Sequence, residues 1–224
     1  MKEQFMMEIN QPPYRLSGTV YGVLMNDPAS LAALGEQVNQ PPYKAAPRAP
    51  VLYVKPRNTL ATSGAQVAAP DGQPALVLGA TLGLVLARAA SRVPREAAWS
   101  YLAGVVLAAD VYVPHDSFYR PSVRFKALDH SCLLGSQVLP LRSDAELAAL
   151  GLSVQVQGGA VQTVGMQGWA RSAAQLLSEV SDFMTLARGD VLLMGLRHAA
   201  PQVARGQRFS VSAPGLSVLE GGVA

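Results

Sequence analysis

The longest apolar stretch of this sequence, PALVLGATLGLVLARAA, spans Pro74–Ala90 and limits what the chain can fold into. Its most apolar part, Ala75–Ala87, is shorter than the about 20 residues that a membrane-spanning helix needs, and it ends at Arg88. Apolar and polar residues alternate poorly along it, which is typical of a strand covered on both faces. We therefore predict a central strand of a buried sheet.

Strand patterns outnumber helix patterns in the rest of the chain. Strands are expected at Leu16–Met25, Ala49–Asn58, Val105–Val113, Val191–Gly195, Arg208–Ala213 and Leu216–Leu219, with a hairpin over Leu152–Val164 that turns at Gly158-Gly159. Helices are expected from Pro28 to about Val38 after the cap Asp27, from Pro94 onward, and over Trp169–Leu186. Without regular strand–helix alternation, the pattern predicts an α+β fold with a mixed sheet. We expect one domain, residues 16–224, after an N-terminal extension, residues 1–15.

Composition argues against several classes of partner. The 18 basic and 15 acidic residues give a formal net charge of +3, and the basic residues lie singly, so we expect no nucleic-acid binding. No apolar signal segment or membrane span is visible, and the single Cys132 fits a reducing compartment, so a cytoplasmic protein without membrane contact is expected. With 50% hydrophobic and 15% charged residues, the chain is expected to bury a subunit interface.

Polar side chains gather in the segment Asp110–Asp129, which begins in a predicted strand. Arginines there match carboxylates through two oxygens at a time and Lys126 offers a point charge, so an anion-binding loop and an ordinary solvated loop both stay open. His115 and Asp116 could form a base with its orienting acid, but adjacent residues rarely face each other. Structural roles are expected for the remaining candidates, which are His130, His198 and Cys132.

Several segments together resemble the fumarylacetoacetate hydrolase family. They are VLYVKPRNTL, GATLGLVLAR, YLAGVVLAADV, FKALDHSCLLGSQV, DFMTLARGDVLLMG and LSVLEGGV, in family order between about Gly18 and Val223. The resemblance implies a mixed β-roll with peripheral helices. It also implies a divalent metal, Mg²⁺ or Mn²⁺, held by a Glu-x-Glu pair of one strand and an aspartate, because hard cations prefer carboxylate oxygens. In the family this metal binds the oxygens of a 2-oxo acid or β-dicarbonyl.

The family's metal ligands are incomplete in this chain. By the resemblance, Gly79 and Thr81 stand where the two glutamates belong, whereas Asp110 matches the aspartate. Lys126 matches the family's substrate-side lysine, and Gly195–Arg197 replaces the family's Gly-Thr-Pro. The resemblance therefore implies a degenerate site in which Asp110 is a residual ligand and no metal is bound tightly.

Within the family, SFYRPSVRFKALD and QPPYKAAP are most similar to the first half of two-domain enzymes that decarboxylate and isomerise 2-oxo acids in aromatic catabolism. That likeness implies catalytic roles for Lys126 and Asp110 and a small di- or tricarboxylate 2-oxo acid bound by Tyr119, Arg120 and Arg124. Two hypotheses remain. The chain is a catalytic subunit of such an enzyme, or it is a non-catalytic partner that completes a paralogous second subunit carrying Mg²⁺ or Mn²⁺. A homodimer is compatible with both.

Overall fold

The computed structural model describes residues 18–118 and 122–224. Its strands are β1 (Val20–Leu24), β2 (Val51–Lys55), β3 (Leu60–Ala61), β4 (Gln66–Val67), β5 (Ala75–Leu86), β6 (Leu102–Tyr112), β7 (Cys132–Leu134), β8 (Gly151–Val156), β9 (Gln162–Gly165), β10 (Val191–Leu193), β11 (Gln202–Ala204), β12 (Arg208–Ser212) and β13 (Leu219–Val223). The α-helices are α1 (Pro28–Leu34), α2 (Val123–Lys126), α3 (Asp144–Ala148) and α4 (Ala173–Phe183). The 3₁₀ helices are η1 (Gly35–Asn39), η2 (Arg57–Thr59) and η3 (Arg95–Tyr101).

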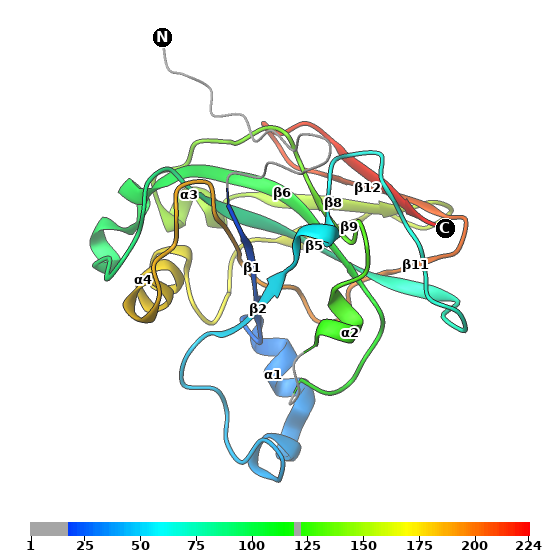
Figure 1. The fold of residues 1–224 in the computed structure, drawn as a ribbon, viewed down its shortest axis with the longest axis horizontal. Helices are drawn as coiled ribbons and strands as arrows, with labels where there is room; N and C mark the ends of the chain where they lie inside the picture. The colour runs from blue at the N-terminus through cyan, green and yellow to red at the C-terminus, as the bar shows by residue number, and fades with distance from the viewer. Residues whose placement is uncertain (1–17, 119–121) are drawn as a thin grey trace.

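Two sheets form the framework of the described part of the chain (Figure 1). The larger sheet has the order β2-β1-β10-β5-β6-β7-β3, with β11 also paired to β5, and the smaller one has the order β4-β13-β12-β8-β9. Strands β1 and β10 are parallel, whereas β5 and β6 are antiparallel. This mixture of pairings, with only a few helices around it, confirms the predicted α+β class and mixed sheet.

The apolar stretch that dominates the sequence is the centre of the larger sheet, as predicted. Every residue of β5 except Ala75 is buried, and the strand pairs with β6 on one side and with β10 and β11 on the other. Figure 1 shows β5 and β6 as long strands that cross the middle of the molecule. Because both faces of β5 are covered, its side chains need not alternate in polarity, which explains the continuous apolar run.

Some predicted elements begin or end elsewhere. Helix α4 begins after Ser172, whose hydroxyl accepts a hydrogen bond from the backbone N–H of Gln175, so the cap lies within the predicted span. The predicted helix after Pro94 is a 3₁₀ helix, η3. The hairpin of β8 and β9 turns through a wider loop than predicted, in which Gly158 has a φ of 80°. In the described part of the chain, no helix is both long and apolar enough to cross a membrane.

The last strand lies later in the chain than Leu216–Leu219. Strand β13 contains Gly221 and Gly222, which look like strand terminators in the sequence. An added Cβ at Gly221 would lie 2.5 Å from the Phe209 ring and 2.7 Å from a methyl group of Leu133. The glycine therefore allows the two packing partners to approach the backbone of β13, and this tertiary contact outweighs its low strand propensity.

Candidate functional site

The family-matched aspartate lies in the middle of the larger sheet. Asp110, on β6, pairs with Gly79 of β5 on one side and with Cys132 of β7 on the other. Its side chain has no exposed surface. An ionised carboxylate so far from water must be paired, because burial of a lone charge is very costly.

Two lysines and a tyrosine supply that pairing. Lys55 Nζ lies 2.9 Å from Asp110 Oδ1, and Lys126 Nζ lies 2.8 Å from Asp110 Oδ2. The Tyr53 hydroxyl also donates a hydrogen bond to Oδ2. Lys55 donates further hydrogen bonds to Ser131 Oγ, at 3.0 Å, and to the backbone oxygen of Lys126. We call Tyr53, Lys55, Asp110 and Lys126 the Asp110 cluster.

Burial and charge act in opposite directions on the groups of this cluster. Burial raises the pKa of Asp110, but the ammonium groups of Lys126 and Lys55 outweigh it and lower that pKa to about 2. Burial lowers the pKa of Lys126 to about 8, although Asp110 opposes the shift. Burial, followed by the nearby charge of Asp110, raises the pKa of Tyr53 well above its usual range, so Tyr53 stays a proton donor.

The positions of the missing glutamates are filled by other groups. Gly79 lies opposite Asp110, and an added Cβ there would lie 2.7 Å from both methyl carbons of Leu196 and 2.9 Å from the Asp110 backbone oxygen. Thr81 is fully buried, and its hydroxyl makes one long hydrogen bond, 3.4 Å, to the Leu82 backbone oxygen. The apolar side chain of Leu196 thus occupies the space into which a side chain at position 79 would extend.

These residues do not fit a divalent metal ion. Both oxygens of Asp110 already accept hydrogen bonds from cations, and Gly79 offers no side-chain ligand atom. The nearby carboxylates are not arranged as replacements: Asp116 is exposed, and Asp129 is exposed and accepts a hydrogen bond from Asn58 Nδ2 at 2.6 Å. Among the described residues, no three His, Cys, Asp or Glu side chains are grouped closely enough to hold a metal.

Calorimetric titration of the isolated chain with Mn²⁺ is therefore expected to give no heat beyond that of dilution. A Mg²⁺ or Mn²⁺ site needs several oxygen ligands in near-octahedral order, and Asp110 is held by two ammonium groups. A crystal soaked in Mn²⁺ provides the second measurement. An ordered ion coordinated by Asp110, with micromolar affinity in solution, would contradict this expectation.

The loop that carries Leu196 is held by the next residue. The Arg197 guanidinium bonds Asp27 Oδ1 at 3.1 Å and the Gly165 backbone oxygen at 2.7 Å, and it stacks 3.8 Å from the centroid of the Trp169 ring. These contacts join the loop after β10 to the start of α1 and the end of β9. The segment that replaces the family's Gly-Thr-Pro is therefore a fixed part of the fold.

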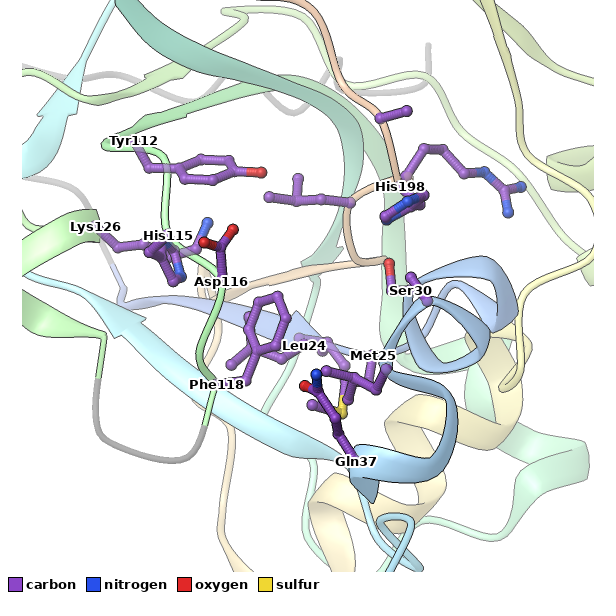
Figure 2. A pocket seen from close by; sticks show the side chains of 16 residues that line it. Leu24, Met25, Ser30, Gln37, Tyr112, His115, Asp116, Phe118, Lys126 and His198 are labelled. Carbon is purple, nitrogen blue, oxygen red and sulfur yellow. The ribbon is translucent and has the colours of Figure 1, made fainter. Parts of the chain in front are cut away.

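A cavity of about 400 Å³ lies beside the Asp110 cluster (Figure 2). Among the described residues, its polar lining consists of Ser30, Gln37, Tyr112, His115, Asp116, Lys126, Arg197 and His198, and its apolar lining includes Leu34, Phe118 and Leu196. In Figure 2 the labelled side chains converge from the end of β1, from α1 and η1, from residues 112–118, from α2, which carries Lys126, and from the loop that carries His198. Lys126 belongs to both the Asp110 cluster and the cavity wall, with its Nζ 3.6 Å from the centroid of the Tyr112 ring.

The structure brings together some of the residues that the sequence singles out. Lys126 lines the cavity, and Asp110 lies behind it at 2.8 Å. Arg124 is exposed on α2 and does not belong to the described lining of the cavity. Tyr119 and Arg120 lie outside the described residues.

Sequence reasoning missed Tyr53, Lys55 and Leu196 as site residues. Lys55 ends an apolar strand immediately before a proline, and a charged residue at such a position is a weak signal for a buried partner. Nothing local to Leu196 indicates that it packs over Gly79, since the two lie far apart in the sequence. The pairing of β10 and β11 with β5, on either side of Gly79, brings them together in the folded protein.

Fold and site together define a β-roll domain with a buried carboxylate–lysine cluster beside a ligand-sized cavity. The sequence model of the fumarylacetoacetate (FAA) hydrolase C-terminal family matches residues 19–224, so the chain belongs to this family. It is 38% identical over 205 residues to the 4-hydroxyphenylacetate degradation bifunctional isomerase/decarboxylase of Salmonella dublin, and the match covers 92% of this chain and 47% of that protein. The chain thus spans about half the length of the curated relatives that it matches.

Solved structures confirm the fold. The 5-carboxymethyl-2-hydroxymuconate delta-isomerase of Mycobacterium smegmatis superposes with a TM-score of 0.75 at 22% identity, over 92% of this chain and 76% of that one. The fumarylpyruvate hydrolase of Pseudomonas aeruginosa, solved with Mn²⁺ and pyruvate, gives 0.76 at 21% identity, over 100% and 97% of the two chains. The expected β-roll with peripheral helices is therefore confirmed.

Proposed function

We propose that the chain is a catalytic subunit of the bifunctional decarboxylase/isomerase of 4-hydroxyphenylacetate (homoprotocatechuate) degradation. Its substrates would be 5-carboxymethyl-2-oxo-hex-3-enedioate for decarboxylation and 2-hydroxyhepta-2,4-diene-1,7-dioate for isomerisation. The observation that carries the proposal is the cavity beside Lys126, in a chain whose relatives of that name are 36–38% identical over 92% of its length.

Lys126 suits the chemistry of an unsaturated 2-oxo acid. When the carboxylate on carbon 5 leaves as CO₂, the electron pair of the broken bond moves through the carbon–carbon double bond onto the 2-oxo oxygen. The resulting dienolate becomes a 2-hydroxydiene when that oxygen takes up a proton. An ammonium group fixed beside the cavity stabilises the negative charge that develops there, and Asp110 holds Lys126 in place at 2.8 Å.

The substrate carboxylates need further partners. We propose that Tyr119, Arg120 and Arg124 bind them, since guanidinium groups pair with carboxylates through two hydrogen bonds. Arg124 lies on α2, two residues before Lys126, and Tyr119 and Arg120 precede that helix in the chain. A paralogous domain that keeps the Glu-x-Glu pair would supply the divalent metal of the family, because this chain does not present the ligands for it.

A matched pair of lysine variants tests the proposal. Lys55 and Lys126 each make one ion pair with Asp110, but only Lys126 belongs to the described lining of the cavity. Lys126→Met is expected to lower the turnover rate at least about 100-fold, which is the usual effect of removing one group that stabilises charge in the transition state. Lys55→Met is expected to lose similar thermal stability but retain most of the turnover of the folded protein.

The assay measures CO₂ release and the ultraviolet absorbance of the diene, with the chain alone and with a metal-bearing paralogue. Equal loss of turnover in the two lysine variants at equal stability would show that Lys126 acts only through the fold. Turnover by the chain alone would show that it is catalytic without its paralogue.

A non-catalytic partner role is the second candidate. It is favoured by the space at Gly79 being filled by Leu196 and by the engagement of both Asp110 oxygens with lysines. In that case Lys126→Met would leave the activity of the assembled complex unchanged, and the wild-type chain alone would be inactive while still raising the stability of its paralogue.

A further inference from the structure

His115 lines the cavity, and one of its two ring nitrogens is buried without a hydrogen-bond partner among the described residues. Its Nδ1 lies 2.9 Å from the backbone oxygen of Val113. A carbonyl oxygen only accepts, so Nδ1 carries the proton, and in the neutral ring Nε2 is left as an acceptor. Nε2 is buried, and no group in the described part of the chain is hydrogen-bonded to it.

The ring is held firmly in this orientation. It stacks on Phe125 with 4.7 Å between centroids and an interplanar angle of 7°. The rings of Tyr112 and Phe118 meet it edge-on at 5.6 Å and 5.5 Å. Aromatic packing on three sides and the bond to Val113 therefore fix the ring at the cavity wall, where Figure 2 shows it next to Asp116.

A buried acceptor without a donor is unfavourable, and a ligand that brings a donor relieves that cost. Lys126, on the same wall of the cavity, is a donor without acceptor capacity. The two groups together suit a ligand with a negatively charged oxygen and an O–H group close together. A 2-hydroxydienoate carries both, whereas its 2-oxo tautomer carries acceptors alone.

We propose that His115 is a specificity-determining residue whose Nε2 accepts the hydrogen bond of a 2-hydroxyl group, so that the cavity selects the 2-hydroxy form of an unsaturated dicarboxylate over its 2-oxo form. This inference rests on the proposed function, because it assigns the ligand of the same cavity. Asp116 is the competing acceptor, since its exposed carboxylate also lies at the cavity wall.

Two stable six-carbon acids of equal charge test the selection. 2-Hydroxyadipate carries an O–H group at carbon 2, and 2-oxoadipate carries an acceptor there. Calorimetry with the full chain is expected to show about tenfold tighter binding of 2-hydroxyadipate, the worth of one added hydrogen bond to a buried group. His115→Phe keeps an aromatic ring against Phe125 but loses the acceptor, so it is expected to abolish the preference.

Asp116→Asn is the matched control and is expected to keep the preference. A preference that disappears in Asp116→Asn and persists in His115→Phe would assign the reading of the hydroxyl to Asp116 and overturn the inference. Equal binding of the two acids by the wild type, or tighter binding of 2-oxoadipate, would also overturn it but leave the proposed function standing. Binding of neither acid would contradict both.

A nitrogen-15 spectrum of the wild-type chain gives a measurement that does not depend on how the variants fold. The His115 signals are expected to show the Nδ1–H tautomer. The Nε2 signal is expected to shift on addition of 2-hydroxyadipate and to stay in place with 2-oxoadipate. An Nε2–H tautomer, or equal shifts with both acids, would contradict the proposal.

Discussion

Replacing Asp110 by asparagine is expected to lower the free energy of unfolding by about 3–5 kcal/mol, the usual cost of breaking a buried ion pair by removing one partner. Asparagine has nearly the same shape, so the loss comes from charge rather than from packing. Lys55 and Lys126 would be left with side-chain exposures of 0% and 3% and no counter-ion in the cluster. Urea denaturation followed by circular dichroism measures the change.

Glu179→Gln provides the control. Glu179 pairs with Arg171 at 2.6 Å, but its side chain keeps 33% of its surface exposed, so solvent screens the pair. Its removal is expected to cost less than about 1 kcal/mol. If Asp110→Asn costs no more than Glu179→Gln, the Asp110 cluster does not contribute to stability in the way that its geometry indicates.

The same carboxylate predicts an acid limit to stability. The pKa of Asp110 falls from 3.8 to about 2 on folding, so above about pH 4 the unfolded chain gains nothing by taking up this proton. As the pH falls from about 4 to 2, the unfolded state binds the proton first and stability is lost, by roughly 2 kcal/mol from this group. The Asp110→Asn variant is expected to lack this part of the acid-induced loss.

A large loss of stability is also expected when the missing glutamate ligands are introduced into β5. Adding Gly79→Glu and Thr81→Glu to the chain is expected to destabilise it without creating Mn²⁺ affinity. A side chain at position 79 meets the Leu196 methyls at 2.7 Å, and overpacking of this kind costs about 1–3 kcal/mol. Two further buried carboxylates raise that cost.

Gly79→Ala isolates the steric part of this effect. Its cost is expected to be about 1–3 kcal/mol and to shrink when Leu196→Ala is added, because the two side chains compete for one space. Thermal denaturation of the single and double variants measures this coupling. Two results would contradict the assignment of Leu196 as the group that fills the site. One is additive losses when Gly79→Ala and Leu196→Ala are combined, and the other is micromolar Mn²⁺ binding by the chain with Gly79→Glu and Thr81→Glu while Leu196 is intact.

The fold was predictable where local pattern and tertiary environment agree. The central strand β5 could be identified because a strand covered on both faces must be apolar throughout. The position of β13 was not predictable, since Gly221 is required by its close contact with Phe209 and Gly222 by its close contact with Gln66, whereas strand propensity disfavours both. The sequence also predicted a helix after Pro94 but not that this helix, η3, is a 3₁₀ helix.

Some residues of the site could be predicted from the sequence, and others could not because they depend on tertiary contacts. Asp110 and Lys126 could be identified because each lies within a segment that resembles the family. Lys55 reaches Asp110 from a strand 55 residues earlier, and Leu196 covers Gly79 from a loop much later in the chain. Such contacts depend on strand order in the sheet, which periodicity and spacing do not encode.

The net charge of the Asp110 cluster makes its positive electrostatic field independent of the availability of metal ions. Two ammonium groups face one carboxylate, so below about pH 8 the cluster holds one positive charge in excess. The source of that field is bonded covalently to the polypeptide. It cannot be removed by a chelator, diluted away, or lost when a cell runs short of manganese or magnesium. The electrostatic attraction of the cluster for an anion in the neighbouring cavity therefore does not vary with the concentration of divalent metal ions in the cell.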